Sequence, residues 1–514
     1  MPIRMSGMAS GLDTENIVKE LMSAQRLKTD KINKNITKME WKRDKWKELN
    51  TKIYALYTGE LSKIRMQGNF NIKKATSSNE DKVEVKASNS VPEGAHTVQV
   101  LSTASAQFIT GSQIDQENLS YSTKLVDMDM SDSVGSTINI KAGKNEVALE
   151  IKAETTIGDV VSSLQNAGLN ASFDVTQKRF FISSKQGGIE NAFSIESADP
   201  GNPVELQKLG LSEISKSVDT ENGTAEITVA ANVSVIDPSD AVIIYNGARI
   251  RSSSNTITAN GLSITVKGVT DESTDEVISV GITRDTQAVY DMVKGFVKSY
   301  NEVLKEMNGA YNTEAAKGYE PLTDEEREAM TDDQVEKWEK RIKDSLLRRD
   351  NTLGSLMNTM RTTLSKGVEV DGKKYSLASF GITSVDYKEE GLLHINGDKD
   401  DALVASGEEK LMKAISENPD AVMKVFSSLA SELYGTLTEE MKSTSLNSAL
   451  TLYNDKEINN KITDYKEDLS KLEGRLQAME SRYYKQFTAM ESMMSKLNTQ
   501  SSSIASILGM NTNS

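Results

Sequence analysis

Hydrophobic residues recur at helical spacing in the first part of the chain. From Ile17 to about Ile64 they return at intervals of three and four residues, interrupted by polar residues near Lys42 and Arg43. The apolar seam consists of Ile32, Ile36, Met39, Trp46, Leu49, Ile53 and Leu56. Such spacing predicts a helix that packs along another helix, as in a coiled coil. We expect Asp13 to cap its first turn.

The last part of the chain carries a longer seam of the same kind. Its apolar positions are Ile458, Ile462, Tyr465, Leu469, Leu472, Leu476, Met479, Tyr483, Phe487, Met490, Met494 and Leu497. Two four-residue steps meet at Tyr483, a stutter that locally unwinds a left-handed supercoil. Because both ends carry matching seams, we predict that they pair with each other.

Apolar positions continue beyond this seam at Ile504 and Leu508, but the residues between them are Ser, Thr, Gln and Asn. A segment of this composition packs poorly alone and stays unfolded until a partner covers it. The same holds for "MSGMASGLDT" near the start. We therefore predict that both termini become ordered on assembly.

Between the helical ends the hydrophobic period changes from helical to alternating. "KVEVKA" and "HTVQVLS" read as strands, and "STINIKAGKNEVALEIK" predicts a hairpin that turns at Gly143–Asn145. Residues 156–188 predict a short helix followed by two strands. Strands return in "AEITV", "DAVIIYNGARI" and "GLSITVKG", with Asn246-Gly247 as a hairpin turn. We expect β-rich domains from about residue 76 to 285.

Helical spacing resumes at "AVYDMVKGFVKSYNEVLKEM" and continues, with breaks, to the end. Two capping boxes, Thr323 with Glu326 and Thr331 with Gln334, predict two short helices in an acidic stretch. The segment "EVDGKKYSLASFGITSVDYKEEGLLHI" predicts a β interruption within this helical part.

Charge and composition restrict the function. The chain has 60 Lys+Arg and 75 Asp+Glu, a net charge of −15, which disfavours a whole-chain role on nucleic acid or anionic lipid. It has no cysteine, so disulfides, thiolate nucleophiles and cysteine metal sites are excluded. No basic region followed by an apolar stretch marks a secretory signal peptide, and no window approaches ~18 unbroken apolar residues.

The N-terminal helix is nevertheless basic and bears Trp41 and Trp46. Its basic residues are Arg26, Lys28, Lys31, Lys34, Lys38, Lys42, Arg43, Lys45 and Lys47. A basic helix with aromatic residues suits nucleic acid, but at this net charge a solvated face beside an acidic partner helix is the favoured interpretation.

No catalytic, cofactor-binding or metal site is predicted. The phosphate-binding motifs with spaced glycines are absent. Two acidic stretches, 127–135 and 398–409, begin like calcium loops, but Asp132 and Leu403 stand where the sharp-turn glycine belongs. His96 and His394 lie on strand-like stretches far apart and are expected to be structural.

Methionines gather near the C-terminal end of the chain. The stripe consists of Met479, Met490, Met493 and Met494. Methionine side chains adapt to changing partners, so the stripe fits an adaptable binding surface. A coiled-coil core is the commoner explanation, and the two alternatives can coincide.

Several stretches resemble the flagellar filament-capping, hook-associated FliD family. "SGMASGLDTENIVKELMSAQ" resembles its opening motif, and "GAHTVQVLSTASAQ" is similar to the strand that closes its N-terminal region. "NGARIRSSSNTITANGLSITVKGVT" and "SRYYKQFTAMESMMSKLNTQSSSIASIL" resemble stretches of its C-terminal region. Residues 156–195 are similar to a small helix–strand unit of hook and filament proteins. Residues 107–235 and the acidic insert 314–344 diverge from the family pattern.

The fold expected from pattern and resemblance is α+β and multidomain. Terminal helices form a coiled-coil or helical-bundle leg, and central β-rich, sandwich-like domains form the head. The expected divisions are flexible terminal helices at 1–41 and 470–514, a helical leg domain at 42–75 and 286–469 with a β-hairpin insert near 368–396, a β-rich head domain at 76–106 and 236–285, and a second, more variable head domain at 107–235.

The resemblance implies a structural role at the distal tip of the bacterial flagellum. Members of the family leave the cell unfolded through the flagellar export apparatus, aided by a cytoplasmic export chaperone and without a cleaved signal peptide. They form a ring homo-oligomer, commonly a pentamer, which promotes flagellin folding and insertion and prevents the loss of flagellin. In some bacteria the exposed head is also an adhesin. No enzymatic activity, cofactor, nucleic acid partner or membrane insertion is expected.

Two other classes of function remain open from the residues. Another axial flagellar protein, either a hook–filament junction protein or flagellin, would share the paired terminal coiled coil. A cytoplasmic coiled-coil scaffold would explain the helices but not the central β domains. The order of "NGARIRSSSNTI" and "RYYKQFTAME" along the chain favours the cap.

Two sets of candidate residues follow from the seams. Residues expected to contact the filament or a neighbouring subunit are Leu12, Ile17, Leu21, Phe487, Met490, Met494, Leu497, Ile504 and Leu508. Residues expected to form the seam of the helical leg are Ile36, Met39, Trp46, Leu49, Ile53, Leu56, Ile462, Leu469, Leu472, Leu476, Met479 and Tyr483.

Overall fold

The computed structural model describes residues 13–507 except 200–202, 220–222, 231 and 387–388. These residues fall into two compact units. The helical unit comprises the chain up to Phe70 and from Thr286 onward, and the β unit comprises Asn71–Asp285. The first and last described segments of the chain therefore share one unit, and the β unit is inserted between them in the sequence.

One part of the β unit consists of two antiparallel sheets. The first has the strand order β1-β17-β3-β13-β14 and the second β15-β16-β2. The strands are β1 (Lys73–Ser77), β2 (Val83–Ala87), β3 (Gly94–Ser102), β13 (Ala241–Tyr245), β14 (Ala248–Ser252), β15 (Thr256–Ala259), β16 (Leu262–Val266) and β17 (Ile278–Arg284). Alternating aliphatic residues from both sheets, such as Val98 and Ile264, form one buried cluster. This is the sandwich-like arrangement that period-two patterning predicts.

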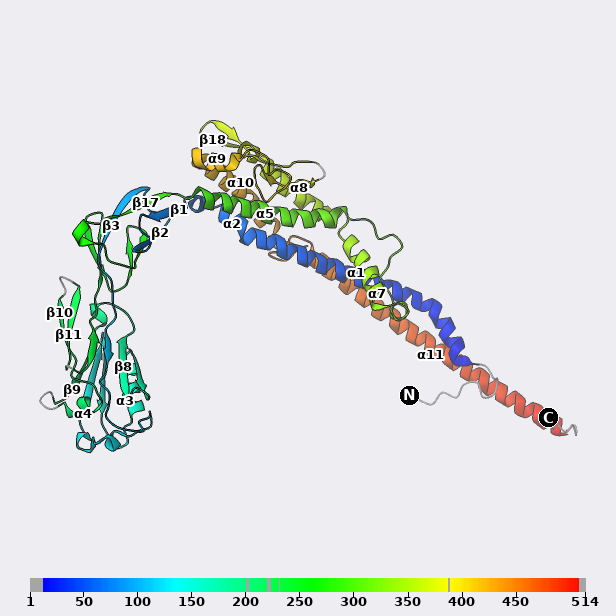
Figure 1. Cartoon of the computed structure of the whole chain (residues 1–514). Helices are drawn as coiled ribbons and strands as arrows, with labels where there is room; N and C mark the ends of the chain where they lie inside the picture. Colours follow the sequence, from blue (N-terminus) through cyan, green and yellow to red (C-terminus); the bar gives the residue numbers. More distant parts are fainter. Residues whose placement is uncertain (1–12, 200–202, 220–222, 231, 387–388, 508–514) are drawn as a thin grey trace. The chain divides into compact units, whose positions relative to one another are not determined.

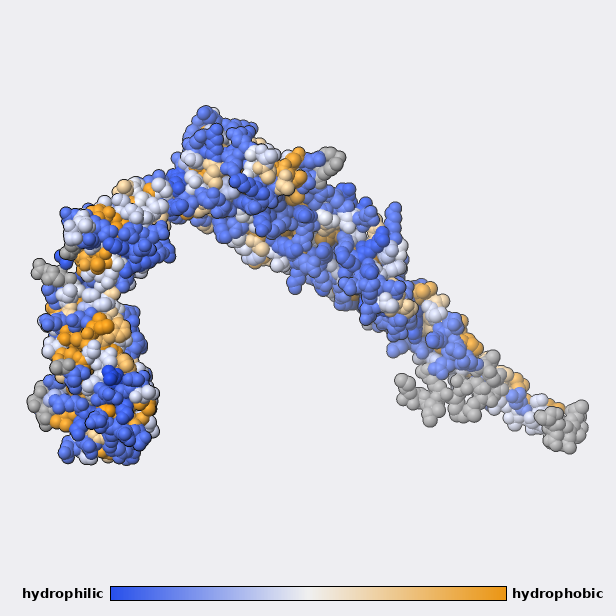
Figure 2. Space-filling view, in the orientation of Figure 1, coloured by the Kyte–Doolittle hydropathy of each residue, from blue (hydrophilic) through white to orange (hydrophobic). Residues whose placement is uncertain are grey.

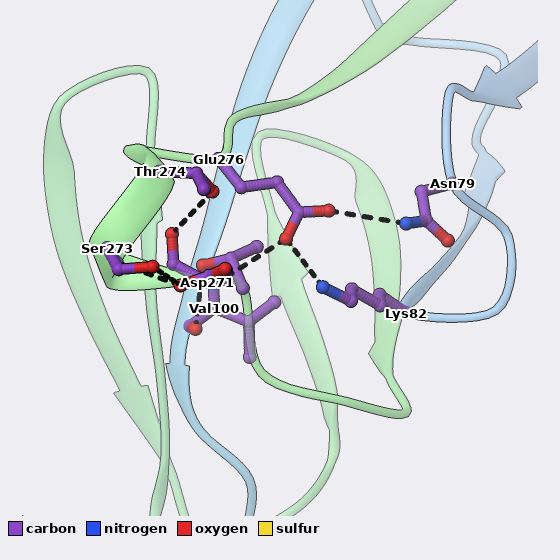
Figure 3. A network of polar contacts seen from close by, with 8 residues as sticks. Asn79, Lys82, Val100, Asp271, Ser273, Thr274 and Glu276 are labelled. Atoms are coloured by element: carbon purple, nitrogen blue, oxygen red, sulfur yellow. Dashed lines mark hydrogen bonds and ion pairs between the residues drawn. The ribbon is translucent and has the colours of Figure 1, made fainter.

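A polar network fastens the loop before β17 to the β1–β2 turn (Figure 3). The Glu276 carboxylate accepts hydrogen bonds from Lys82 Nζ at 2.5 Å, Asn79 Nδ2 at 3.3 Å and the Asp271 backbone N–H at 2.9 Å. Ser273 donates from both its hydroxyl and its backbone N–H to Asp271 Oδ1. The hydrogen bond from Lys82 lowers the pKa of Glu276, so this carboxylate stays ionised and keeps the loop in place.

The other part of the β unit surrounds a second buried cluster that contains Phe180 and Phe193. Its sheets have the orders β12-β4-β8-β7, β6-β5-β9 and β10-β11. Its elements are β4 (Phe108–Thr110), β5 (Thr137–Ala142), β6 (Asn145–Glu150), α3 (Ile157–Asn166), β7 (Leu169–Asp174), β8 (Arg179–Ser184), β9 (Phe193–Ser197), α4 (Val204–Lys208), β10 (Ser215–Asp219), β11 (Thr224–Thr228) and β12 (Ser234–Ile236).

The local sequence signals in the β unit are confirmed. Asn246 and Gly247 turn the β13–β14 hairpin with φ values of 48° and 83°, the left-handed geometry that Asn-Gly adopts most easily. Gly143 lies in the turn between β5 and β6, as predicted. A helix and two strands follow Thr156, which caps α3 by accepting a hydrogen bond from the Asp159 backbone N–H.

The helical unit is built from nine helices among its described residues, together with two short hairpins (Figure 1). The helices are α1 (Thr14–Thr58), α2 (Glu60–Ile64), α5 (Thr286–Asn312), α6 (Asp324–Glu328), α7 (Asp332–Ser345), α8 (Asn351–Ser365), α9 (Lys410–Glu417), α10 (Pro419–Glu440) and α11 (Asp455–Ile507). The hairpin strands are β18 (Val368–Val370), β19 (Lys373–Tyr375), β20 (Ile382–Thr383) and β21 (His394–Ile395). These hairpins form the predicted β interruption.

The N-terminal helix begins as predicted but does not run unbroken to Ile64. Asp13 caps α1 by accepting a hydrogen bond from the Asn16 backbone N–H at 3.0 Å. The helix breaks at Gly59, whose backbone is not helical (φ −90°, ψ −110°). A Cβ atom at Gly59 would lie 2.7 Å from the Ala55 carbonyl oxygen, so the break requires glycine.

The C-terminal helix extends through the stretch rich in Ser, Thr and Asn, because α11 continues as helix to Ile507. Extending a formed helix costs far less than starting one, so a long helix carries its geometry into residues of modest propensity. That the termini become ordered only on assembly stays a prediction. Among the described residues, none of the helices has the length and apolar character needed to cross a membrane.

Candidate functional site

The two long helices, α1 and α11, pack against each other in antiparallel orientation. Trp46 stacks on Tyr453 with ring centroids 5.4 Å apart, and Glu40 pairs with Lys466 at 2.8 Å. The earlier residue on α1, Glu40, faces the later of the two partner residues, Lys466, so the two helices run in opposite directions. The predicted pairing of the two ends of the chain is thus present in the structure (Figure 1).

The near half of the leg, which we define as the region where α1 from Ile36 onward meets the start of α11, has a seam that is buried except at Met39. The predicted seam residues buried there are Ile36, Trp46, Leu49, Ile53, Leu56 and Ile462. Asn50 fixes the register, because its side-chain amide donates to the Leu450 carbonyl at 3.1 Å and accepts from the Leu452 backbone N–H at 2.9 Å. Neither Asn50 nor Tyr453 was among the sequence candidates, since both act through contacts about 400 residues away along the chain.

The far half of the leg, which we define as α11 from Leu469 onward with the facing part of α1, is covered less completely. The predicted seam residues there are all half-buried: Leu469, Leu472, Leu476, Met479 and Tyr483. Met39, in the near half, is half-buried too. Near the start of α1 the buried apolar side chains are Val18 and Met22. The neighbouring candidates are less shielded: Ile17 is half-buried, and Leu21 is 43 % exposed. Part of each side chain is therefore available for contact.

The last turns of α11 present an apolar stripe to solvent. Phe487, Met490 and Met494 are half-buried, whereas Leu497 is 61 % and Ile504 56 % exposed. Met493, weighed above only as part of the methionine stripe, is 70 % exposed. Hydrophobic residues reach the surface near this end of the helix (Figure 2). The candidates Leu12 and Leu508 lie outside the described residues.

Geometry places the exposed residues on one face of α11. At about 100° per residue, Met493, Leu497 and Ile504 point within roughly 40° of one another. Lys496 is the only charged residue between Ser492 and Ile507. An uncharged apolar stripe of this kind suits contact with another protein surface rather than a solvated face.

The basic face of α1 meets acidic residues, as the sequence-based interpretation expected. Lys34 Nζ lies 2.8 Å from the Glu326 carboxylate, and Lys42 Nζ lies 2.8 Å from that of Asp350. Lys38 pairs with Glu320. These acids come from the insert between α5 and α8, so part of this basic face is occupied within the chain.

Both histidines have structural partners. His96 Nδ1 and the Tyr245 hydroxyl lie 2.9 Å apart in a hydrogen bond. His394 Nδ1 lies 2.5 Å from Asp401 Oδ2. His96 lies in β3 and His394 in β21, the strand positions that the sequence predicted.

The acidic loop 398–409 is held by basic side chains. Lys294 Nζ donates to Asp398 at 2.6 Å and to Asp400 at 2.7 Å, and these hydrogen bonds raise the pKa of Lys294 above its usual value. Asp401 already holds His394. The carboxylates therefore serve to fasten the loop, and within the described part of the chain no three His, Cys, Asp or Glu residues are grouped for a metal ion.

Comparison with known families identifies this architecture. The family described as flagellar hook-associated protein 2 N-terminus (FliD) matches residues 10–107, and that described as flagellar hook-associated protein 2 C-terminus (FliD) matches residues 238–499. The chain belongs to the FliD family. The second match alone spans more than half of the chain and includes most of α11. The family match agrees with the resemblance seen in the sequence.

Individual FliD proteins are similar over most of their length. A flagellar hook-associated protein 2 of Halalkalibacterium halodurans is 25 % identical over 98 % of this chain and 99 % of its own. The B-type flagellar hook-associated protein 2 of Pseudomonas aeruginosa is 25 % identical over 86 % of this chain and 84 % of its own. The crystal structure of the D1-D2-D3 domains of the Escherichia coli flagellar cap protein FliD covers 78 % of this chain and 96 % of its own, with 19 % identity and a TM-score of 0.49.

FliD proteins form the flagellar filament cap, an extracellular oligomer that sits on flagellin. The comparisons support this function, and they do not support a hook–filament junction protein, a flagellin or a cytoplasmic scaffold. Residues 108–237 lie between the two family matches. They coincide closely with the stretch that diverges from the family pattern and contain the second cluster of the β unit.

Proposed function

We propose that this chain is a subunit of a ring of identical chains that caps the distal end of the flagellar filament. The observation that carries the proposal is the FliD match across both ends of the chain, which together build the α1–α11 leg. Five subunits is the number that the resemblance favours. The work is structural: the cap promotes the folding and insertion of flagellin and prevents its loss, with no catalytic step.

The end of the leg is the proposed contact with flagellin or with a neighbouring leg. Phe487, Met490 and Met494 begin the stripe, and Leu497 and Ile504 extend it beyond the seam that α1 covers. An apolar stripe left open in a free subunit favours aggregation, so a partner that covers it stabilises the assembled state. Methionine suits a contact that is repeatedly remade, because its flexible thioether side chain repacks against different surfaces.

A second copy of this chain is the occupant we propose for an apolar face of the head. The outer face of the β12-β4-β8-β7 sheet exposes Phe108, Phe181 and Ile236, and Ile236 lies directly opposite Phe108. The cross-strand neighbours of the two phenylalanines on this face are Ser183, Thr110 and Ser172, which carry no charge. Two copies of a chain with net charge −15 repel each other elsewhere, so an uncharged face favours self-contact.

Export as an unfolded chain through the flagellar export apparatus, with a cytoplasmic chaperone, is part of the same proposal. A chain without cysteine cannot form disulfides that would block its passage or trap a partly folded state.

The test is complementation of a strain that lacks its own cap protein. Expression of the full chain should restore filaments and reduce the flagellin released into the medium. In a strain that lacks flagellin, the chain itself should appear in the medium, and it should be absent from the medium when the export gate is also removed. Retention of the chain in the cytoplasm of a strain with a working export gate would contradict the proposal and favour a scaffold.

A further inference from the structure

The acidic insert between α5 and α8 is a small folded body of its own. The Trp338 indole N–H donates to the Glu320 carbonyl at 2.8 Å, and the ring of Trp338 packs 4.4 Å from that of Tyr319. The Arg341 guanidinium lies 4.8 Å from the centroid of the Tyr319 ring. Both predicted capping boxes form, at Thr323 for α6 and Thr331 for α7. The insert thus has local reasons to keep its shape whether or not it touches α1.

The insert buries very few apolar side chains. None of the residues of α6 is buried, and only Glu339 and Ile342 are buried in α7. By contrast, Pro321 before α6 and Leu347 after α7 are buried. Hydrophobic burial, the largest stabilising contribution in most packed helices, is therefore nearly absent from these two helices. Apart from Ile342, these two helices offer little apolar packing, so polar and charged contacts must supply most of their attachment to α1.

Ion pairs supply that attachment. Lys34, Lys38 and Lys42 recur every four residues and so lie on one face of α1. Their partners are Glu326 at 2.8 Å, Glu320, and Asp350 at 2.8 Å, respectively. The hydrogen bond from Lys34 lowers the pKa of Glu326, which agrees with a formed pair.

A lysine of the insert also contacts α1. Lys343 Nζ lies 4.5 Å from the centroid of the Trp41 ring on α1, within the range of a cation–π contact. Asp350 also caps α8 by accepting hydrogen bonds from the backbone N–H groups of Thr352 and Leu353. The C-terminal end of the insert is thereby joined to α8, whereas α6 and α7 are attached to α1 mainly by charged side chains.

We propose that residues 314–345 are an electrostatic strap, which closes over α1 at Lys34–Lys42 and opens reversibly while the rest of the helical unit, including the buried Leu347 and the capping residue Asp350, stays folded. Partly exposed ion pairs contribute little each and are screened by salt, so opening requires little energy. Both ends of the strap are anchored in the chain, which makes the opening local. The strap operates in the purified chain and needs no flagellar partner.

The position of the strap gives it a consequence for the leg. Lys34–Lys42 lies where the near half of the leg passes into the far half. A closed strap fixes α1 at this point, and an open strap frees Lys34 and Lys38 for an acidic partner surface. The strap is thus a conformational device that sets how much of the leg is held in place.

Hydrogen exchange on the full chain tests the strap directly. The triple variant Lys34→Gln, Lys38→Gln, Lys42→Gln should exchange the backbone amides of α7 at least tenfold faster than wild type, with α5 and α10 unchanged. The matched control is Lys28→Gln, Lys31→Gln, Lys47→Gln, which removes the same charge from exposed positions of the same helix. The control should leave the exchange of α7 as in wild type.

Charge reversal separates pairing from general destabilisation. Lys38→Glu alone should speed the exchange of α7, and Lys38→Glu combined with Glu320→Lys should return it toward the wild-type rate. Three results would each overturn the proposal: unchanged α7 exchange in the triple variant, equal acceleration in the matched control, or a simultaneous loss of protection in α5 and α10.

A distance measurement gives an independent readout, because the chain has no cysteine and accepts two labels cleanly. Spin labels at Lys337→Cys on α7 and Lys47→Cys on α1 should report one narrow distance at low ionic strength. At about 1 M salt, where screening acts within about 3 Å, the distribution should broaden toward longer distances and recover on dilution. A distribution that does not respond to salt would mean that the strap does not open.

Discussion

The near and far halves of the leg carry the same heptad spacing but differ in burial. In the near half, Trp46, Ile53 and Ile462 are almost completely shielded from solvent. In the far half, Leu472 and Met479 are only half-buried at equivalent positions of the pattern. The periodicity of a seam therefore predicts which face is apolar, but not how many neighbours cover it.

The difference comes from additional helices that pack against the near half. α2 and α5 pack against α1 there, and Lys52 on α1 pairs with Glu306 on α5 at 2.6 Å. In the far half, the packing that the structure records for α11 is with α1. A single partner helix shields only one side of an apolar stripe from solvent, and a second or third helix is needed to bury the stripe completely.

The largest effect is expected from a charge placed in the near half. Trp46→Asp removes a side chain that is 2 % exposed and stacked on Tyr453, and it leaves an unpaired carboxylate in its place. We expect a loss of about 4 kcal/mol or more in the unfolding free energy of the helical unit. Urea unfolding followed by far-UV circular dichroism measures it. The β unit should keep its own transition.

The conservative variant Trp46→Phe serves as the control for this site. It keeps an aromatic ring against Tyr453 and should cost about 1–2 kcal/mol, which is at most about half of the charged variant's effect. A wild-type midpoint for Trp46→Asp would show that the seam does not hold the two ends of the chain together.

The next largest effect is expected at high pH, from the helix that covers the near half. Burial raises the pKa of Tyr300 on α5 from 10.0 to about 12. Because the folded state prefers the protonated phenol, this stability is fully present below pH 10 and is lost as the pH rises through about 12. At 1.36 kcal/mol per unit, the loss amounts to about 2–3 kcal/mol.

Tyr300→Phe isolates this contribution. Phenylalanine cannot ionise, so the unfolding free energy of the helical unit should fall less steeply between pH 10 and 12 in the variant than in wild type. Identical slopes for the two proteins would mean that Tyr300 ionises without cost and that α5 leaves it accessible.

A smaller effect is expected when the charge is placed in the far half. Leu472 is half-buried, so an aspartate there can turn toward water. We expect Leu472→Asp to cost about 1 kcal/mol in the same urea experiment, well below Trp46→Asp. A cost equal to that of Trp46→Asp would show that the far half is covered as completely as the near half, and the comparison would fail.

The features that the sequence predicted well are those that neighbouring residues decide. The Asn246-Gly247 turn and the capping boxes at Thr323 and Thr331 depend on residues within a few positions, and the structure confirms them. The Asp13 cap and the helix after Thr156 belong to the same class. Local backbone preferences and side-chain caps act in the same way wherever the segment lies in the fold.

The features that the sequence did not predict have two causes. The break at Gly59 depends on the local path of the backbone, which no hydrophobic periodicity reports, whereas the others depend on distant partners. The choice of Val18 and Met22 as the buried pair, in place of Ile17 and Leu21, depends on which face of α1 is covered. The assignment of contact residues at the end of α11 remains a prediction, because it concerns surfaces outside the chain.

The smallest effect on folding, and the most informative for assembly, is expected at the end of the leg. Met490→Ser with Met494→Ser changes two half-buried side chains in the far half, so the unfolding free energy should change by less than about 1 kcal/mol. Capping should nevertheless weaken, because the stripe loses apolar area where a partner would cover it. In the complemented strain, more flagellin should reach the medium and filaments should shorten. The matched control is Met490→Leu with Met494→Leu, which keeps the apolar area but stiffens the side chains, so that assembly persists with slower filament growth. Filaments of normal length from the double serine variant would show that these methionines belong only to the seam with α1.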